Sequence, residues 1–395
     1  MNQFNFYANK PSQNYNKIDM WLLASILLLW GFGIFTLFVC SQNYAVRAFG
    51  DPMYFVKKQL ITSLVGFVLF FALMIMDIRY IRKFVSVVVI VSLVLCILTF
   101  IPGISITKNG ARRWLRLAGN FTFQPSELVK FAIVLFLANY FDKQEKLINP
   151  EEKTVFPCVL GLVVFAGIVF AQKDFSTGVF ITVIGILLFF VSGAKLVWIF
   201  PFTVLAIPTV FLMITLNPFR LQRLIGWISP DEFTSSINYQ SLAAKRAISA
   251  GGVWGSGIGA GLSRINSIPE IQADYIFAGW AEAMGYVGVV IYFVLLLFFA
   301  YRGYRTALKN PDRFSALAAF GCVSVIFLQS LLNTMVVSGL LPTTGINLPF
   351  FSLGGSSIIV TLAMCGFLLN TSRCEEIFEK KSESDEINIE SLSYL

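Results

Sequence analysis

Residues 20–40 read MWLLASILLLWGFGIFTLFVC and contain no charged side chain. A bilayer core about 30 Å thick is crossed by about 20 helical residues, so this stretch has the length of a transmembrane helix. It follows a polar segment, 1–17, and is longer than the apolar part of a signal peptide, so we expect it to remain as a membrane anchor. The stretch predicts a helical membrane protein.

The rest of the chain repeats this pattern. Apolar residues make up 56% of the 395 residues and charged residues 13%, whereas soluble domains carry about 25% charged residues. The runs lack the two-residue alternation of a transmembrane β-barrel. They predict an all-α, polytopic transmembrane helix bundle of about ten spans, with a long extracytoplasmic loop, 217–275, between spans 7 and 8. Eight further runs carry almost no charge: 60–76, 84–101, 154–171, 179–191, 196–216, 276–300, 314–337 and 356–369. The tenth, 125–141, contains Glu127 and Lys130.

An even number of spans places both termini on one side. The predicted inner connectors hold only slightly more Lys and Arg than the outer loops, so the orientation depends on short basic connectors such as 77–83. We therefore expect cytoplasmic tails at 1–17 and 372–395 and a membrane domain at 18–371. The charged C-terminal tail has few apolar residues, which is typical of disorder.

Positive charge also gathers in two predicted outer loops, against the usual topology. Contact with lipid headgroups or loop ion pairs would explain it. A phosphate-binding surface is the alternative, since arginine binds phosphate oxygens in a bidentate manner. The cations are Lys108, Arg112, Arg113 and Arg116 in one loop, and Arg220, Arg223, Lys245, Arg246 and Arg264 in the other.

The chain contains no histidine, which excludes His-based acid–base catalysis, His metal ligands and a Ser-His-Asp triad. Two other ionisable groups stand out. Pro125 is expected in the first turn of a helix, which places Glu127 and Lys130 on one helical face. Such a pair at membrane depth either faces a functional cavity or locks helices together, and both interpretations remain open.

Asp274 lies at the entry of a predicted span, after a glycine-rich stretch at 251–261. A carboxylate with one wet and one apolar side can act as a general base, because burial raises its pKa. Asp is equally common as a helix N-cap, so capping is the alternative. The uncharged segment 333–357 is rich in Pro, Gly and Ser, which predicts a broken or re-entrant helix that forms a cavity wall.

Three motifs together resemble the SEDS family (shape, elongation, division and sporulation). They are GARRW and FQPSELVK between 110 and 130, PE with ADYIFA between 269 and 278, and LPTTG with LPF and GGSS between 341 and 357. The resemblance is closer to the division-type than to the elongation-type members. It implies a peptidoglycan glycosyltransferase that polymerises lipid II, an undecaprenyl-pyrophosphate-linked disaccharide-peptide, at the outer face of the bacterial cytoplasmic membrane. It also implies a class B penicillin-binding protein as transpeptidase partner, within the divisome or elongasome.

The resemblance assigns roles residue by residue. Asp274 matches the essential aspartate, which is expected to deprotonate the acceptor sugar. The resemblance also implies that a divalent cation, Mg²⁺ or Mn²⁺, can assist the reaction, although the sequence shows no cluster of carboxylates that would hold it. The expected substrate-binding residues are Arg112, Arg113, Trp114, Glu127, Lys130, Lys245 and Glu270.

The chain departs from the family pattern near these positions. Gln272-Ala273 replace His-Thr, Ala283 replaces the second residue of a Glu-Glu pair, and Lys173 replaces the proline of a Gln-Pro-Asp loop. The rival hypotheses are a lipid II flippase, an elongation-type polymerase and a non-catalytic scaffold for the transpeptidase.

Overall fold

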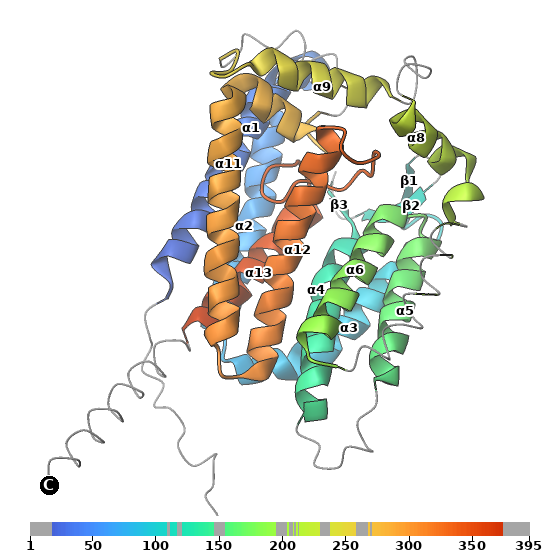
Figure 1. The fold of residues 1–395 in the computed structure, drawn as a ribbon, viewed down its shortest axis with the longest axis vertical. Helices are drawn as coiled ribbons and strands as arrows, with labels where there is room; N and C mark the ends of the chain where they lie inside the picture. The colour runs from blue at the N-terminus through green and yellow to red at the C-terminus, as the bar shows by residue number, and fades with distance from the viewer. Residues whose placement is uncertain are drawn as a thin grey trace, which may run out of the picture.

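The computed structural model describes residues 18–108, 111–116, 121–145, 155–194, 204, 208, 211, 213–229, 238–257, 268 and 271–373. Its described part is a bundle of long helices with a small sheet and two shorter helices at one end (Figure 1). The bundle helices are α1 (Met20–Phe49), α2 (Tyr54–Ile75), α3 (Ile78–Leu98), α4 (Pro125–Glu145), α5 (Phe156–Ala171), α6 (Phe175–Val191), α11 (Ile276–Lys309), α12 (Arg313–Val337) and α13 (Gly355–Ser372).

Six of these helices, α1, α2, α3, α11, α12 and α13, are long and apolar enough to cross a membrane. Helices α5 and α6 are apolar but shorter, and α4 lies beside them with its charged pair. The predicted polytopic helical bundle is therefore confirmed. Nine of the ten predicted spans correspond to a helix, and the tenth, 196–216, lies largely outside the described residues.

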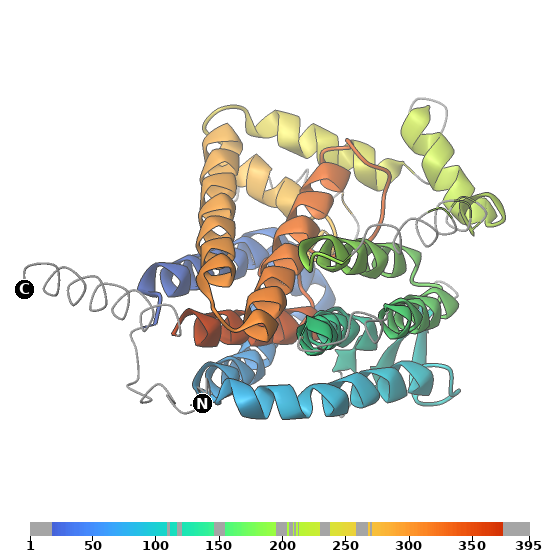
Figure 2. The same ribbon diagram turned by 60° about the horizontal axis from the view of Figure 1, so that its bottom comes forward.

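The two ends of the bundle differ. One end, here called the turn end, carries the short connections at 76–77 and 310–312. The other, the loop end, carries the sheet, the segment 338–354, and the helices α8 (Pro218–Ile228) and α9 (Tyr239–Gly251) (Figure 2). Each candidate site residue that the structure describes, apart from the Glu127–Lys130 pair within α4, belongs to a loop-end element.

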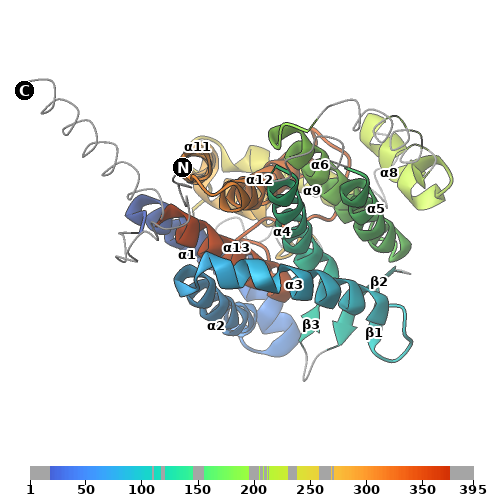
Figure 3. The same cartoon turned by 90° about the horizontal axis from the view of Figure 1, so that it is seen from below.

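Helix α13 is the centre of the bundle. The most apolar stretch of α13 is 89% buried, against 22% for that of α3. Figure 3 shows α13 between α2 and α3 on one side and α11 and α12 on the other. Close packing depends on glycine: a Cβ on Gly366 would lie 2.3 Å from the carbonyl oxygen of Phe70, so only a hydrogen fits.

Three ion pairs join helices at the turn end. Arg82 of α3 pairs with the buried Asp142 of α4. Arg302 of α11 pairs at 2.6 Å with Asp19, the N-cap residue of α1. The third pair, 3.3 Å between Arg313 and Glu145, joins α12 to α4. The turn end is thus tied across helices that are distant in the sequence.

The loop between α3 and α4 forms a three-stranded antiparallel sheet that the sequence did not predict. Its strands are β1 (Ser105–Lys108), β2 (Ala111–Arg116) and β3 (Thr122–Phe123). A bulge interrupts the first pair: Thr107 pairs with Arg112 and Ile106 with Trp114, which leaves Arg113 without an opposite residue. Such bulges re-aim a side chain, and here the side chain is that of Arg113.

Helix α11 is broken at Gly285, which has φ +65°. The glycine-rich segment after α9 fills the break: Ser256 and Gly257 donate backbone hydrogen bonds to the carbonyl oxygens of Glu282 and Ala283. The N–H of Tyr286 in turn donates to Gly252. The described part of this segment is therefore held against α11 by its backbone.

Candidate functional site

The segment 338–354 folds back into the bundle between α12 and α13. It is uncharged, yet its carbonyl oxygens accept hydrogen bonds from side chains on three helices, α6, α8 and α12. This explains how an irregular backbone is satisfied inside the protein, as the prediction of a cavity wall requires. The bonds are Arg223 Nη1 to Thr343 O (3.3 Å), Ser176 Oγ to Thr344 O (2.8 Å), Asn333 Nδ2 to Ile346 O (2.8 Å) and Gln329 Nε2 to Asn347 O (2.9 Å).

Asp274 is held against this segment. Its backbone carbonyl accepts a hydrogen bond of 2.9 Å from Asn333 Nδ2. Its carboxylate is half-buried and lies beside Gly345, where a Cβ would be 3.4 Å from Oδ2. The N-cap of α11 is Tyr275, whose side chain makes no capping hydrogen bond. Asp274 lies one residue before this position.

Arg223 of α8 interacts electrostatically with both Asp274 and a second cation, Arg113. Burial lowers the pKa of the Arg223 guanidinium. The neighbouring Tyr275 and Asp274 raise this pKa, and the positive charge of Arg113 lowers it. Burial and the neighbouring Asp274 raise the pKa of Tyr275 to about 12. The phenol is thus neutral near pH 7, and Asp274 is the anion that opposes Arg223.

Arg113, Arg220 and Arg223 form an arginine surface at the loop end. Burial lowers the pKa of Arg220, and the charge of Arg113 lowers it further, so these cations repel one another. The Arg220 guanidinium stacks 4.6 Å from the ring centre of Phe175. Clustered guanidinium groups of this kind are suited to bind a phosphate-bearing anion.

Asp174 orients Arg113. The two side chains form an ion pair of 3.4 Å, and Asp174 is 2% exposed. Its Oδ2 also accepts hydrogen bonds from Gln124 Nε2 at 2.9 Å and Ser126 Oγ at 3.1 Å. These bonds hold the carboxylate between the start of α4 and the start of α6. Asp174 therefore fixes the position of Arg113 relative to α4.

Lys173 adopts a conformation that is uncommon for lysine, with φ +63°. Its carbonyl oxygen accepts a hydrogen bond from Arg113 Nη2. A proline, the residue of the family pattern at this position, cannot adopt a positive φ. The connection between α5 and α6 thus presents its carbonyl to Arg113 in a way that proline would prevent.

Glu127 and Lys130 form the predicted pair within α4, with 2.8 Å between Oε2 and Nζ. They are only 6% and 2% exposed. Lys130 also donates at 2.6 Å to Oε1 of Gln329, which in turn contacts Asn347. The prediction that the two charges share one helical face is confirmed. The pair is connected through Gln329 to the same segment that holds Asp274.

Other candidate residues lie outside this network. Arg112 is exposed and donates at 3.4 Å to the carbonyl oxygen of Phe100, and Trp114 is half-buried in β2. Lys245 packs its side chain over Gly339, where a Cβ would lie 1.9 Å from Cε. It lines a crevice between α8, α9 and 338–345 that has room for no more than about one water molecule. Glu270 lies outside the described residues.

Four residues of this network were not among the predicted catalytic or substrate-binding residues: Asp174, Arg223, Gln329 and Asn333. Arg223 was one of several cations in the outer loop. Gln329 and Asn333 are amides inside an apolar run, and a polar group at membrane depth is itself a signal of function or close packing. Asp174 belongs to a segment that carries the resemblance. These residues make contacts between helices that are distant in the sequence, and a single sequence does not show such contacts.

The described residues contain no group of three or more His, Cys, Asp or Glu side chains that could hold a metal ion. Asp174 and Asp274 are instead opposed by arginines.

Comparison with known proteins identifies the family. The model of the cell cycle protein family FtsW/RodA/SpoVE matches residues 20–377. A relative from Trichlorobacter lovleyi, named "Probable peptidoglycan glycosyltransferase FtsW", is 33% identical over 90% of this chain and 93% of its own length. Stage V sporulation protein E of Bacillus subtilis is 32% identical over 90% and 97%.

Solved structures share the fold. A chain from "Structural coordination of polymerization and crosslinking by a peptidoglycan synthase complex" is similar with TM-score 0.73 and 26% identity, covering 90% of this chain and 98% of that one. RodA of Thermus thermophilus is similar with TM-score 0.66 and 24% identity, covering 91% and 98%. The chain belongs to the FtsW/RodA/SpoVE family, which is the SEDS family, and is FtsW-like within it.

Proposed function

We propose that the protein is a peptidoglycan glycosyltransferase that polymerises lipid II during septal cell-wall synthesis. The observation that carries the proposal is the placement of Asp274: its backbone is fixed by Asn333, and its negative charge acts on Arg223 of the arginine surface. A base beside a site for a phosphate leaving group is the arrangement that glycosyl transfer from a pyrophosphate carrier requires. The relatives' names support the same activity.

In the proposed reaction, Asp274 accepts the proton of the acceptor sugar's 4-hydroxyl. The hydroxyl oxygen forms a bond to the anomeric carbon of the donor, and the bond from that carbon to the pyrophosphate oxygen breaks with its electron pair. Arg113 and Arg223 stabilise the negative charge that develops on the departing pyrophosphate. Asp174 keeps Arg113 in place. The Lys130–Gln329 contact positions 338–354 behind the acceptor.

The membrane topology follows from this assignment. The loop end, with α8, α9 and the arginine surface, faces the outside of the bacterial cytoplasmic membrane. The turn end and both termini face the cytoplasm. Lipid II then lies in the outer leaflet with its pyrophosphate at the level of Arg113 and Arg223. A class B penicillin-binding protein is the proposed partner, in line with the similarity to a chain of a peptidoglycan synthase complex.

A lipid II flippase would need access from both ends of the bundle. The turn end is held by the pairs Asp19–Arg302, Arg82–Asp142 and Glu145–Arg313. Opening it would separate the buried carboxylates of Asp19 and Asp142 from their arginines, and a buried charge that loses its partner costs about 3–5 kcal/mol. A bifunctional crosslink between cysteines placed at 19 and 302 separates the two functions. A polymerase remains active when crosslinked, whereas a flippase stops.

The decisive experiment uses purified protein, lipid II and the transpeptidase partner. Asp274→Asn should lower the rate of glycan formation by about 10²–10⁴-fold, the usual contribution of a general base. Asp51→Asn is the matched control, because Asp51 is an exposed carboxylate at the loop end, 2.7 Å from Lys57. Glycan chains of normal length and rate from Asp274→Asn would refute the proposed mechanism. Transport of lipid II without glycan from the wild type would refute the proposed function.

A further inference from the structure

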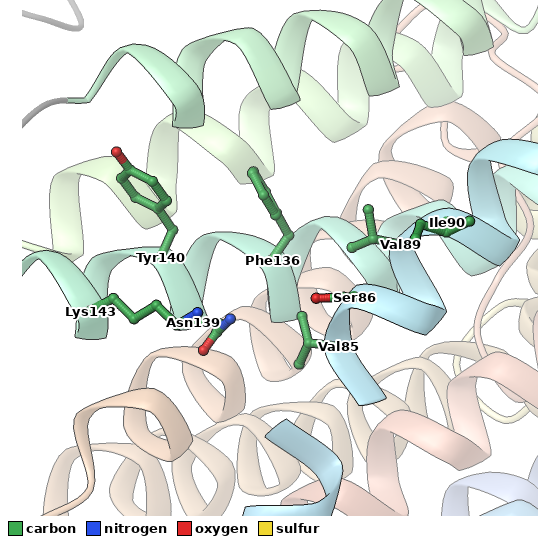
Figure 4. Close-up of a pocket in the computed structure, with 8 residues that line it drawn as sticks. All are labelled: Val85, Ser86, Val89, Ile90, Phe136, Asn139, Tyr140 and Lys143. Atoms are coloured by element: carbon green, nitrogen blue, oxygen red, sulfur yellow. The ribbon is translucent and has the colours of Figure 1, made fainter. Parts of the chain in front are cut away.

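A cavity of about 250 Å³ lies between α3 and α4 (Figure 4). It occupies the half of α3 and α4 that is nearer the turn end. The proposed transfer reaction uses none of its residues. Its lining is Val85, Ser86, Val89 and Ile90 from α3, and Phe136, Asn139, Tyr140 and Lys143 from α4.

The cavity opens to the outer surface of the bundle. Val85 forms its floor with 2% exposure, whereas Ile90 is 60% exposed and Ser86 and Lys143 are also exposed. This surface faces lipid, because α3 is the least buried of the six membrane-crossing helices. The cavity is therefore accessible from the bilayer.

Aromatic rings form the apolar wall. The Phe136 ring lies on Gly161 of α5, where a Cβ would be 2.5 Å from the ring, so glycine leaves room for it. Tyr140 is 6.4 Å from Phe136 between ring centres, and its hydroxyl accepts a hydrogen bond of 2.9 Å from Gln144. These contacts fix both rings, so the wall is preformed.

The opposite end of the cavity is polar and positive. Lys143 lies in the last turn of α4, and Asn139 lies one turn before it. The Oδ1 atom of Asn139 accepts a hydrogen bond of 3.0 Å from Arg82, which itself pairs with Asp142. The Asn139 amide is thus oriented, and Lys143 adds positive charge at the level where a helix leaves the membrane.

We propose that this cavity binds one acyl chain of an anionic phospholipid, with Lys143 on the headgroup phosphate. The chain lies against Val85, Val89 and Phe136, and the phosphate lies at the turn end. Phe136 and Lys143 are seven residues apart, which is about 10 Å along a helix, so several methylene groups fit between wall and headgroup. Polar and basic groups at one end of an apolar cavity match the two parts of a phospholipid.

The cavity dimensions favour a lipid over a partner helix. A helix with its side chains is about 10–12 Å wide, too wide to enter a depression of 250 Å³. Helix pairs in membranes also favour small residues at the contact, whereas α3 presents the β-branched Val85, Val89 and Ile90 here beside a single Ser86. A flexible acyl chain requires neither feature.

Native mass spectrometry of the full-length protein in detergent tests the proposal, with phosphatidylglycerol and phosphatidylcholine as probes. The wild type should bind phosphatidylglycerol more tightly than phosphatidylcholine. Lys143→Ala should weaken phosphatidylglycerol binding about fivefold, the contribution of one lysine near an anionic lipid surface. Val89→Phe, which fills the cavity, should weaken both lipids. Lys83→Ala is the control, a lysine near the same end that does not line the cavity.

Equal binding of phosphatidylglycerol by the wild type and Lys143→Ala overturns the proposal, as does equal affinity of the wild type for both lipids. If Val89→Phe does not fold, Lys143→Ala decides alone. A photoreactive residue at Ser86 in native membranes tests the occupant directly. A phospholipid adduct supports the proposal, whereas a protein adduct shows a partner helix and overturns it. These results do not depend on glycan formation, so they stand or fall separately from the proposed function.

Discussion

The side-chain amide of Asn333 donates a hydrogen bond of 2.9 Å to the backbone carbonyl of Asp274. The same nitrogen donates at 2.8 Å to Ile346. One amide in the last turns of α12 therefore joins the turn before α11 to the segment 338–354. The proposed catalytic carboxylate takes its position from this bond.

Asn333→Ala should lower both stability and turnover, because each buried carbonyl that loses its donor costs about 1–3 kcal/mol. Asn310→Ala is the matched control, since Asn310 Nδ2 donates to Thr371 O at 3.0 Å at the turn end. Both variants should lower the temperature of thermal unfolding, but only Asn333→Ala should lower the rate of glycan formation per folded molecule. Equal rates for the two variants would show that Asn333 is only structural.

Asp174→Asn should weaken lipid II binding, because Arg113 loses its charged partner while the amide keeps the shape of the carboxylate. Asp142→Asn provides a second buried carboxylate paired with an arginine, at the turn end. Titration of lipid II should show a raised KM for Asp174→Asn and an unchanged KM for Asp142→Asn. If both change KM alike, Asp174 has no specific role in positioning Arg113.

Lys130→Met should destabilise the protein by about 3–5 kcal/mol, because Glu127 stays buried without its cation. The double variant with Glu127→Gln removes the unpaired charge and should recover most of the stability, which thermal unfolding measures. If the pair also positions 338–354 for catalysis, glycan formation remains low in the double variant. Recovery of both stability and activity would assign the pair a structural role alone.

Gly345→Ala should reduce glycan formation, because Gly345 has φ +75° and a Cβ would contact Asp274 Oδ2 at 3.4 Å. Forcing alanine into the left-handed region costs about 1–2 kcal/mol. Gly50→Ala separates this strain from the contact: Gly50 has φ +71° with nothing within 4 Å of a Cβ. We expect similar losses of stability in the two variants and a loss of activity only at Gly345. Similar activities would argue against a role for the contact.

The sequence predicted the helical part of the fold well, because a bilayer requires long apolar runs and such runs are visible in any single sequence. The helix that begins at Pro125 and its Glu127–Lys130 pair were also predictable from local spacing. The sheet was not. Its strands are four, six and two residues long, too short for a periodic pattern, and they form only by pairing with one another.

The site could be predicted only in part. Asp274 was recognisable as an acid at the entry of a span. The hydrogen-bond acceptors of the segment 338–354 could not be predicted. They are backbone carbonyls, which side-chain identities do not reveal, and they belong to Thr343, Thr344, Ile346 and Asn347. Arg113 and Arg223 are distant in the sequence, and their electrostatic interaction depends on the position of α8 relative to the sheet at the loop end.

The segment 338–354 also has a consequence for biosynthesis. The segment is synthesised after all three helices whose side chains donate hydrogen bonds to it, since α6, α8 and α12 precede it in the chain. The proposed active centre is therefore completed only after these three helices have been synthesised. A chain that stops before residue 338 would contain α12 and the helices before it, yet lack the segment against which Asp274 is held.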